Sequence, residues 1–258
     1  MGKQNIQIFG FIPARAESSR FPGKPLADIQ GVPMVVRVLR QAQKSTIMQK
    51  VYIATDSQEI LATVESHGGQ AILTGKEHKS GTDRIAEAAR KVGLKDDDIV
   101  VNIQGDQPTL DPSMIEEVVH PLLDNPQIPM STLIYKIVRD VEITHTNAVK
   151  TVFDSEGFAI YFSRATIPYY RSGRSSLDYY KHHGIYAYRH DFLQVFNTLP
   201  PGPLELAEGL EQLRALENGY RVKIVITSKD SIEVDTPEDL ERARSNVEKE
   251  ELTSTFAQ

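Results

Sequence analysis

The first 125 residues of the chain alternate between short apolar runs and segments with helical spacing. The apolar runs predict buried strands at residues 6–12, 51–54, 71–73 and 99–103. The segments between and after them predict helices: 33–44 with Pro33 as its first residue, one ending near His67, 83–92 with Thr82 as its N-cap, and one starting at Asp111. Near-continuous apolar strands separated by helices favour a parallel sheet with helices on both faces.

The rest of the chain shows a different pattern, with more strands and fewer helices. Strands are predicted at 130–138, 184–189 and 221–226, and the runs 148–153 and 158–162 flank a turn, which predicts a hairpin. Helices are predicted at 204–217 and from Pro237 onward. We therefore expect an α/β fold with a mostly parallel mixed sheet and an antiparallel insertion. We expect one domain over residues 1–248, with halves of about 1–128 and 129–248, and a tail at 249–258.

Composition excludes several classes of function. The chain has 29 basic and 35 acidic residues, a net charge of −6, which argues against a general nucleic-acid binder. It has no Cys, so disulfides, thiolate metal sites and a Cys nucleophile are excluded. The first residues lack the apolar core of a signal peptide, and no run approaches the ~18 apolar residues of a membrane span. We expect a cytoplasmic protein with neither a membrane nor a nucleic-acid partner.

The loop after the first predicted strand combines three cations with three prolines: Arg15, Arg20 and Lys24 with Pro13, Pro22 and Pro25. Proline restricts the backbone, so the loop loses less entropy when it orders. A stiff cationic loop past the carboxyl end of a strand is where an open α/β sheet binds an anion, and a polyphosphate is the natural ligand. The chain has neither a Walker loop nor a G-x-G-x-x-G fingerprint, which argues against the usual phosphate-binding motors and dinucleotide enzymes.

Two aspartates supply the carboxylates that a metal–polyphosphate site needs. Asp106 lies just past the fourth predicted strand, at the same sheet edge as the cationic loop, after Gly105. Asp235 comes directly before Thr236, at the start of the last predicted helix. Mg²⁺ prefers carboxylate and phosphate oxygens, so both are candidate ligands. The alternatives are a turn-forming role for Asp106 and a helix-capping role for Asp235.

Several groups in the second half suit a polyhydroxylated acid. The Arg164 guanidinium is able to hold a carboxylate in a bidentate manner. His182 and Tyr186 are four residues apart, and along a strand that starts at about His182 both share one face, so both can face one site. Glu208, Glu211 and Gln212 share a face of the predicted helix 204–217. The alternatives are half-buried aromatic residues on the strand and solvated acids on the helix.

The loop Pro13-Ala-Arg-x-x-Ser18-x-Arg20-x-Pro-Gly-Lys24-Pro-Leu26 resembles the signature of the sugar cytidylyltransferases. The rest of the chain resembles the CMP-Kdo synthetase family, where Kdo is 3-deoxy-manno-octulosonate. The supporting stretches, in order, are Ala54-Thr-Asp56, Ser80-Gly-Thr-Asp-Arg84, Gln104-Gly-Asp106, Asn147-Ala-Val-Lys150, Tyr161-Phe-Ser-Arg-Ala-Thr-Ile-Pro168, His183-Gly-Ile-Tyr-Ala-Tyr188, Leu210-Glu-Gln-Leu-Arg214 and Val234-Asp-Thr-Pro-Glu-Asp-Leu240. They span residues 6 to about 245, and together they are specific.

This resemblance implies a three-layer α/β sandwich of the nucleotide-diphospho-sugar-transferase type, with an antiparallel insertion that forms a homodimer. It implies a reaction of CTP with a 2-keto-3-deoxy sugar acid that gives a CMP-sugar and pyrophosphate, for lipopolysaccharide synthesis. Arg15 and Lys24 would hold the triphosphate, and Asp106 and Asp235 would bind Mg²⁺; these four are the expected catalytic residues. The nucleotide would also contact Ala14, Ser18, Arg20 and Ser80. The sugar acid would contact Gln104, Arg164, His182, Tyr186, Glu211 and Gln212.

One position departs from the family pattern. The Kdo enzymes usually read Gln-Gly-Asp-Glu-Pro, whereas this chain has Gln107 at the fourth place. Gln here resembles a branch that activates 8-amino-3,8-dideoxy-manno-octulosonate (8-amino-Kdo). Kdo remains the leading substrate, and the amino sugar is the alternative. Further alternatives are a CMP-neuraminate-type synthetase and a nucleotide-binding regulator without catalysis.

Overall fold

The computed structural model describes residues 6–16, 21–171 and 177–255, with burial of side chains described up to residue 248. The chain forms two compact units. The first contains residues up to 116 together with the segment from 231 onward, and the second contains residues 117–230. The last segment of the chain therefore returns to the unit in which the chain begins. This places Asp106 and Asp235 in the same unit.

The first unit is built on four parallel strands in the order β6-β1-β4-β5. They are β1 (Ile8–Ala14), β4 (Lys50–Thr55), β5 (Gln70–Leu73) and β6 (Ile99–Asn102). All four residues of β6 and six of the seven of β1 are buried, as expected for strands covered on both faces. The predicted parallel α/β arrangement is confirmed. The carboxyl ends of β1 and β6 consequently lie at one edge of the sheet.

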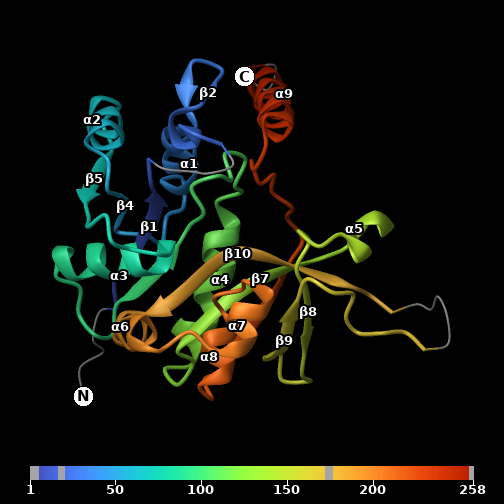
Figure 1. Ribbon diagram of the computed structural model, residues 1–258. Coiled ribbons are helices and arrows are strands. Elements are labelled where there is room, and N and C mark those ends of the chain that lie inside the picture. The colour runs from blue at the N-terminus through green and yellow to red at the C-terminus, as the bar shows by residue number, and fades with distance from the viewer. Residues whose placement is uncertain (1–5, 17–20, 172–176, 256–258) are drawn as a thin grey trace. The chain divides into compact units, whose positions relative to one another are not determined.

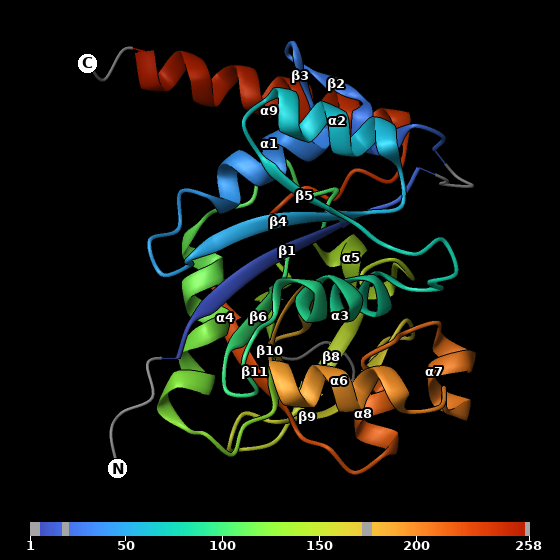
Figure 2. The same ribbon diagram turned by 90° about the vertical axis from the view of Figure 1, so that its left-hand side faces the viewer.

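Helices cover both faces of these strands. Figure 2 shows α1 (Met34–Ala42) and α2 (Gln58–Ser66) on one side of β1, β4 and β5, and α3 (Gly81–Val92) on the other. Two predicted helix starts were wrong by a small margin. Pro33 is the N-cap of α1 and not its first residue. Ser80, and not Thr82, caps α3, because Thr82 turns into the core. The helix predicted from Asp111 is α4 (Ser113–Asp124).

A hydrophobic cluster holds the last segment of the chain against the loop that carries Lys24. The antiparallel pair β2 (Asp28–Ile29) and β3 (Val32–Pro33) follows the short helix η1 (Lys24–Leu26), and α9 runs over Pro237–Thr255, beyond the expected start of the tail. The buried members of the cluster are Ile29, Met34, Val234, Leu240, Ala243 and Val247, and Phe21 and Ala27 pack against them. Because Val234 and Leu240 are anchored in this way, Asp235 lies close to η1.

The second unit has a mixed sheet. β11 (Val222–Thr227) is parallel to β7 (Met130–Lys136), which is antiparallel to β10 (Tyr180–Arg189). β8 (Lys150–Phe153) and β9 (Ala159–Ser163) form the predicted antiparallel hairpin, visible in Figure 1. Its turn is closed by Asp154, whose Oδ1 accepts a hydrogen bond from the Phe158 N–H at 2.8 Å. The expected antiparallel insertion is therefore present.

The helices of the second unit differ from the prediction in one place. The expected helix 204–217 is two short helices, α7 (Pro203–Glu208) and α8 (Leu213–Glu217). Gly209 separates them with a left-handed backbone, at φ 62°, a conformation that glycine adopts at little cost. Glu208 therefore does not share a helical face with Glu211 and Gln212. The remaining helices are α5 (Asp140–Thr144) and α6 (His190–Thr198), and no described helix is both long and apolar enough to cross a membrane.

Candidate functional site

The first unit contains a polar cavity of about 380 Å³ at the carboxyl-terminal edge of its strands. Residues 13–15 lie at the end of β1, 104–106 follow β6, and 78–81 lead into α3. Residues 24–25 of η1, Met34, Arg84 and Asp235 complete the lining. Ligands bind at this edge in open α/β sheets because the loops after the strands converge there. The predicted site residues at this edge thus lie at a cavity, and their role as a ligand site stays a prediction.

Lys24 lies between the two predicted metal ligands. Its Nζ donates to Asp106 Oδ2 at 2.7 Å and to Asp235 Oδ1 at 3.1 Å. The side chains of Lys24, Asp106 and Asp235 are 15%, 27% and 37% exposed, respectively, so the three residues line the cavity without being fully buried. Three residues far apart in sequence therefore form one charged cluster, with two carboxylates around one cation.

The backbone around Asp106 explains why it points to this place. A Cβ on Gly105 would lie 2.8 Å from the Pro13 carbonyl oxygen, which no side chain tolerates. Gly105 thus permits the close approach of the two loops that was expected from its position. The Asp106 carbonyl in turn accepts a hydrogen bond from the Val234 N–H at 2.9 Å, which ties the Asp235 segment to it. Both carboxylates are held by backbone contacts that do not involve Lys24.

The charges of the cluster act on Lys24. Burial by itself would lower the pKa of Lys24, but the carboxylates of Asp106 and Asp235 raise it above its ordinary value. Lys24 therefore stays an ammonium ion in the physiological range. Since the two carboxylates already converge on a cation, their oxygen donors also fit a hard divalent ion such as Mg²⁺.

The other residues predicted to contact the nucleotide line the same cavity, as far as the structure describes them. Ala14 is the buried last residue of β1, and Arg15 is exposed next to it. Gln104 also lines the cavity. Ser80 lines it while its side chain accepts the Asp83 N–H at 3.1 Å, as part of a capping box. Ser18 and Arg20 lie outside the described residues.

The sugar-side predictions, apart from Gln104, fall in the second unit. Arg164 donates from Nε to the Glu208 carbonyl at 2.7 Å and from Nη1 to the Thr146 carbonyl at 3.1 Å. Glu208 is not a solvated acid, because its carboxylate accepts the Arg164 N–H at 2.9 Å and the Ser163 hydroxyl at 2.5 Å. These contacts fix the Arg164 side chain with part of its guanidinium already occupied by backbone carbonyls.

His182 and Tyr186 contact each other, with ring centroids 5.2 Å apart. The strand alternation used to predict this is interrupted by a register shift between His183 and Tyr186. The His182 Nε2 is 2.9 Å from the Thr132 hydroxyl. In the α7–α8 connection, Gln212 is 4% exposed, and its Nε2 has no hydrogen-bond partner among the described residues. An orphaned buried donor of this kind favours a ligand-binding role.

The buried histidines predict a pH dependence of stability. Burial lowers the pKa of His182 to about 3 and that of His183 to about 4. Unfolded histidine titrates near 6.5, so the unfolded chain binds more protons below that pH; stability is full above pH 6.5 and is lost as the pH falls. We expect the free energy of unfolding in urea to fall by ~1.4 kcal/mol per pH unit for each histidine between pH 6 and 5.

A pair of variants tests this expectation. His182→Gln keeps an amide near the Thr132 hydroxyl but cannot titrate, so its stability should fall less steeply with pH than that of the wild type. The exposed His120 on α4 provides the control, and His120→Gln should leave the slope unchanged. Equal slopes in the wild type and His182→Gln would contradict the assignment of a neutral buried imidazole.

Several lining or supporting residues were missed as candidates. Arg84 is 3% exposed and donates to Asp56 Oδ2 at 2.7 Å and to the Thr74 hydroxyl at 2.6 Å. His78 lines the same cavity. The fully buried Lys150 donates to the carbonyls of His145 at 2.8 Å and Arg164 at 2.7 Å. In the sequence, the only signal for Arg84 and Lys150 was their place in the family motifs. Their hydrogen-bond partners lie on other elements of the fold and could not be predicted from the sequence.

The comparisons with known proteins show the family to which the chain belongs. A cytidylyltransferase family model matches residues 9–232. The chain belongs to the cytidylyltransferase family. It is 57% identical over 238 residues to the 3-deoxy-manno-octulosonate cytidylyltransferase of Syntrophus aciditrophicus, covering 92% of this chain and 96% of that protein. It is 49% identical over 239 residues to the 8-amino-3,8-dideoxy-manno-octulosonate cytidylyltransferase of Shewanella sp. strain ANA-3, with coverage of 92% and 96%.

A solved structure supports the same family assignment. It is CMP:2-keto-3-deoxy-manno-octonic acid synthetase complexed with CTP, with a TM-score of 0.89 and 40% identity, covering 95% of this cytidylyltransferase and 99% of the other chain. The resemblance, the fold class and the nucleotidyltransferase activity expected from the sequence are confirmed. A regulator without catalysis gains no support. Relatives of this cytidylyltransferase carry two substrate names, Kdo and its 8-amino analogue.

Proposed function

We propose that this cytidylyltransferase joins CTP to Kdo, giving CMP-Kdo and pyrophosphate, and so activates the sugar for lipopolysaccharide synthesis. The observation that carries the proposal is the convergence of Lys24, Asp106 and Asp235 on one cavity of the first unit. Arg15 and the N-terminus of α3 border that cavity as well. Cations and helix N–H groups suit a triphosphate, and paired carboxylates suit its metal ion.

The carboxylates of Asp106 and Asp235 would hold Mg²⁺, since they already share one cation. When bound, such an ion neutralises phosphate charge and lowers the pKa of an attacking hydroxyl. Lys24 would then leave the two carboxylates and bind the phosphates together with Arg15. Its raised pKa keeps it charged for both partners. Ala14, Ser80 and neighbouring backbone would surround the cytidine, and Ser18 and Arg20 stay expected contacts of the nucleotide.

The transfer itself requires no covalent enzyme intermediate. The anomeric hydroxyl oxygen of the sugar acid attacks the α-phosphorus of CTP in line. One P–O bond forms while the bond between the α-phosphorus and the bridging oxygen of the pyrophosphate breaks, and the hydroxyl proton leaves to solvent. Lys24 and Arg15 stabilise the charge that develops on the departing pyrophosphate. Because the attack is in line, the main contribution of the chain to catalysis is to position the hydroxyl and the α-phosphorus, and no nucleophilic side chain is needed.

The second unit offers several contacts for the sugar acid. His182 and Tyr186 form a contiguous aromatic surface, and Gln212 offers a buried amide donor that has no partner among the described residues. Glu211 lies next to it in the α7–α8 connection. Arg164 retains guanidinium N–H groups beyond those that the backbone carbonyls accept. A polyhydroxylated acid has hydroxyl groups, a carboxylate and a ring face, and these protein groups suit contacts with each of them.

The second candidate substrate is 8-amino-Kdo, and Gln107 is the observation that favours it. Gln107 is fully buried, and its Nε2 donates to Glu233 Oε1 at 3.2 Å. A glutamate at position 107 would face the Glu233 carboxylate across this contact, so the amide changes the charge of the pair. Gln107 is therefore buried against Glu233 and is not an exposed ligand. This arrangement keeps one carboxylate next to the metal-binding segment.

Pyrophosphate release tests the proposal. Each nucleoside triphosphate is combined with Kdo, 8-amino-Kdo and neuraminate, and pyrophosphate is measured. We expect CTP with Kdo to be used at least about tenfold more efficiently than CTP with neuraminate, because a site built around polar contacts rejects a mismatched acid. A higher kcat/KM with 8-amino-Kdo would favour the second candidate. Absence of pyrophosphate with CTP and all three acids would contradict both.

We also propose that the chain works as a cytoplasmic homodimer that pairs through its antiparallel insertion. The supporting observation is exposed apolar surface in this region: Ile160 on β9 is 60% exposed, and Tyr169 after it is 85% exposed. Apolar side chains at such exposure are typical of an interaction surface. The molar mass in solution tests this proposal, and a monomer at micromolar concentration would contradict it.

A further inference from the structure

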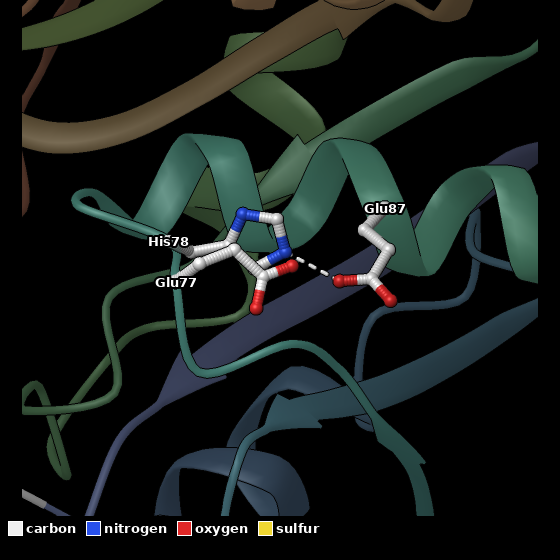
Figure 3. A group of neighbouring side chains, drawn as sticks. All are labelled: Glu77, His78 and Glu87. Carbon is white, nitrogen blue, oxygen red and sulfur yellow. Dashed lines mark hydrogen bonds and ion pairs between the residues drawn. The ribbon is translucent and has the colours of Figure 1, made fainter.

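His78 and Glu87 form a hydrogen-bonded pair at the wall of the nucleotide cavity. His78 lies in the loop before α3 and lines the cavity, and Glu87 is on the second turn of α3. Figure 3 shows the His78 Nε2 directed at the Glu87 carboxylate, with the second ring nitrogen on the side turned away from it. The side chains are 14% and 19% exposed. The pair is therefore largely withdrawn from solvent, and one imidazole nitrogen is left for another partner.

Glu87 is anchored as a permanent acceptor. Its carboxylate accepts the Gly75 N–H at 2.9 Å and pairs with the Lys91 ammonium at 2.7 Å. Burial would raise the pKa of Glu87, but the hydrogen bonds from Lys91, His78 and Gly75 lower it to about 2. An ionised carboxylate only accepts, so the proton of the pair is on His78 Nε2. In the neutral imidazole, Nδ1 then carries a lone pair and acts only as an acceptor.

The same group offers donor atoms for a metal, but its contacts favour the hydrogen-bonded pair. Glu77, His78 and Glu87 have ligand atoms within 4.8 Å of one another. A metal on His78 Nε2 would have to displace the proton that Glu87 accepts. It would also compete with the ammonium of Lys91 and the Gly75 N–H for the Glu87 carboxylate. The carboxylate is already satisfied by three donors.

The nature of the free acceptor decides which part of a nucleotide it suits. His78 Nδ1 has no hydrogen-bond partner among the described residues. Phosphate oxygens only accept hydrogen bonds, so a lone pair repels them, and Lys24 and Arg15 line the same cavity as better phosphate ligands. Cytosine carries a 4-amino group, which donates, whereas uracil has a carbonyl oxygen in that place. A fixed acceptor thus matches cytosine and opposes uracil.

We propose that His78 selects CTP over UTP by accepting a hydrogen bond from the 4-amino group of cytosine through Nδ1, and that Glu87 positions it by holding the Nε2 proton. The inference rests on the proposed function, because that function places cytidine near Ser80, two residues after His78. His78 is a specificity-determining contact and Glu87 a positioning residue. The discrimination is independent of the sugar acid, since it acts on nucleotide binding.

Calorimetric titration of the full chain with CTP and with UTP, without sugar acid, tests the proposal. His78→Gln keeps a group that reaches Glu87 but has no acceptor at the Nδ1 position. We expect its Kd for CTP to rise at least about tenfold while its Kd for UTP stays unchanged, as for loss of one hydrogen bond in a dry site. His78→Asn, whose Oδ1 takes the Nδ1 position, should retain most of the preference. His67→Gln, on an exposed histidine, is the control.

The role of Glu87 is tested by kinetics. Glu87→Gln allows the opposite tautomer of His78, so we expect a higher KM for CTP with an unchanged kcat. Equal losses of CTP and UTP affinity in His78→Gln would overturn the proposal and indicate a contact with ribose or phosphate. An unchanged CTP:UTP ratio would overturn it as well. A wild-type chain that binds CTP but releases no pyrophosphate would contradict only the proposed function.

Discussion

Asp106→Asn is expected to lower kcat by at least ~10²-fold, which is the usual scale for losing one electrostatic element of an active site. The substitution keeps the size of the side chain and removes its charge. It removes one of the two carboxylates that converge with Lys24, at 2.7 Å from Nζ, and so one of two expected ligands of a divalent ion. The amide offers one neutral oxygen to a hard cation that prefers charged ones. Initial rates at saturating CTP and Kdo, over a range of Mg²⁺ concentrations, measure the effect.

Two controls make this result specific to the site. Asp97→Asn changes a carboxylate in the exposed turn before β6 and should leave kcat unchanged. Thermal unfolding of Asp106→Asn should match that of the wild type, because the backbone contacts of Asp106 remain. A fall in kcat smaller than tenfold, with metal affinity unchanged, would show that Asp106 is not a metal ligand and that the convergence with Asp235 serves only to hold Lys24.

Lys24→Ala is expected to raise the KM for CTP ~10- to 100-fold, which corresponds to loss of hydrogen bonds to a charged group. The KM for the sugar acid should change little, because the proposed contact of Lys24 is to the triphosphate. Saturation curves for each substrate, at a fixed excess of the other, separate the two constants. The ammonium is charged in the free chain, since the pKa of Lys24 is raised by its two carboxylates, so the whole charge is lost in the variant.

Matched variants distinguish charge from geometry at this position. Lys24→Arg keeps the charge but replaces a compact ammonium with a planar fork, and we expect an intermediate KM for CTP. Lys44→Ala removes an exposed lysine of the same unit and should have no effect. Equal increases in both KM values for Lys24→Ala would count against phosphate binding, and would indicate instead that the loss of the ammonium disorders the Asp106–Asp235 pair.

Taken together, the two variants separate two roles of one cluster. In the proposed mechanism Asp106 acts on the chemical step, whereas Lys24 acts both on triphosphate binding and on the departure of pyrophosphate. Asp106→Asn should therefore change mainly kcat, and Lys24→Ala should raise the KM for CTP and lower kcat as well. In the free chain one ammonium lies against two carboxylates, so the cluster keeps an excess of negative charge. In the proposed complex, magnesium would supply a cation for the carboxylates and the triphosphate would supply anions for Lys24. Binding of this complex would therefore exchange the ion pairs of Lys24 with Asp106 and Asp235 for new ion pairs with the ligand.

Prediction from sequence worked best where the signal was local. The apolar runs identified the four parallel strands of the first unit, and a residue placed just past a strand was expected at the sheet edge. Asp106 follows β6 and Arg15 follows β1 for that reason. The hairpin around Asp154 was found because a turn residue and two flanking runs suffice. These features depend on neighbours within a few residues.

Prediction failed where two nearly equal local solutions competed. Ser80 and Thr82 are both acceptable helix caps, and the choice depended on the core, which takes up Thr82 as a buried residue. The segment 204–217 has helical spacing throughout, but Gly209 adopts a left-handed backbone and divides it into two helices. Because of that break, Glu208 does not lie beside Glu211, and its carboxylate accepts hydrogen bonds from the Ser163 hydroxyl and the Arg164 N–H. Spacing alone does not report such contacts.

The sequence by itself determined the class of fold and the chemical types available at the site: a stiff cationic loop, two aspartates at strand and helix ends, and a glycine next to Asp106. It did so because periodicity, proline and glycine act on the backbone nearby. Only the tertiary structure decided which charges meet. Lys24 binds Asp106 and Asp235 from 82 and 211 residues away, and His78 pairs with Glu87 on the next helix. Ion pairs and shared protons depend on distances in space, which packing of the core sets.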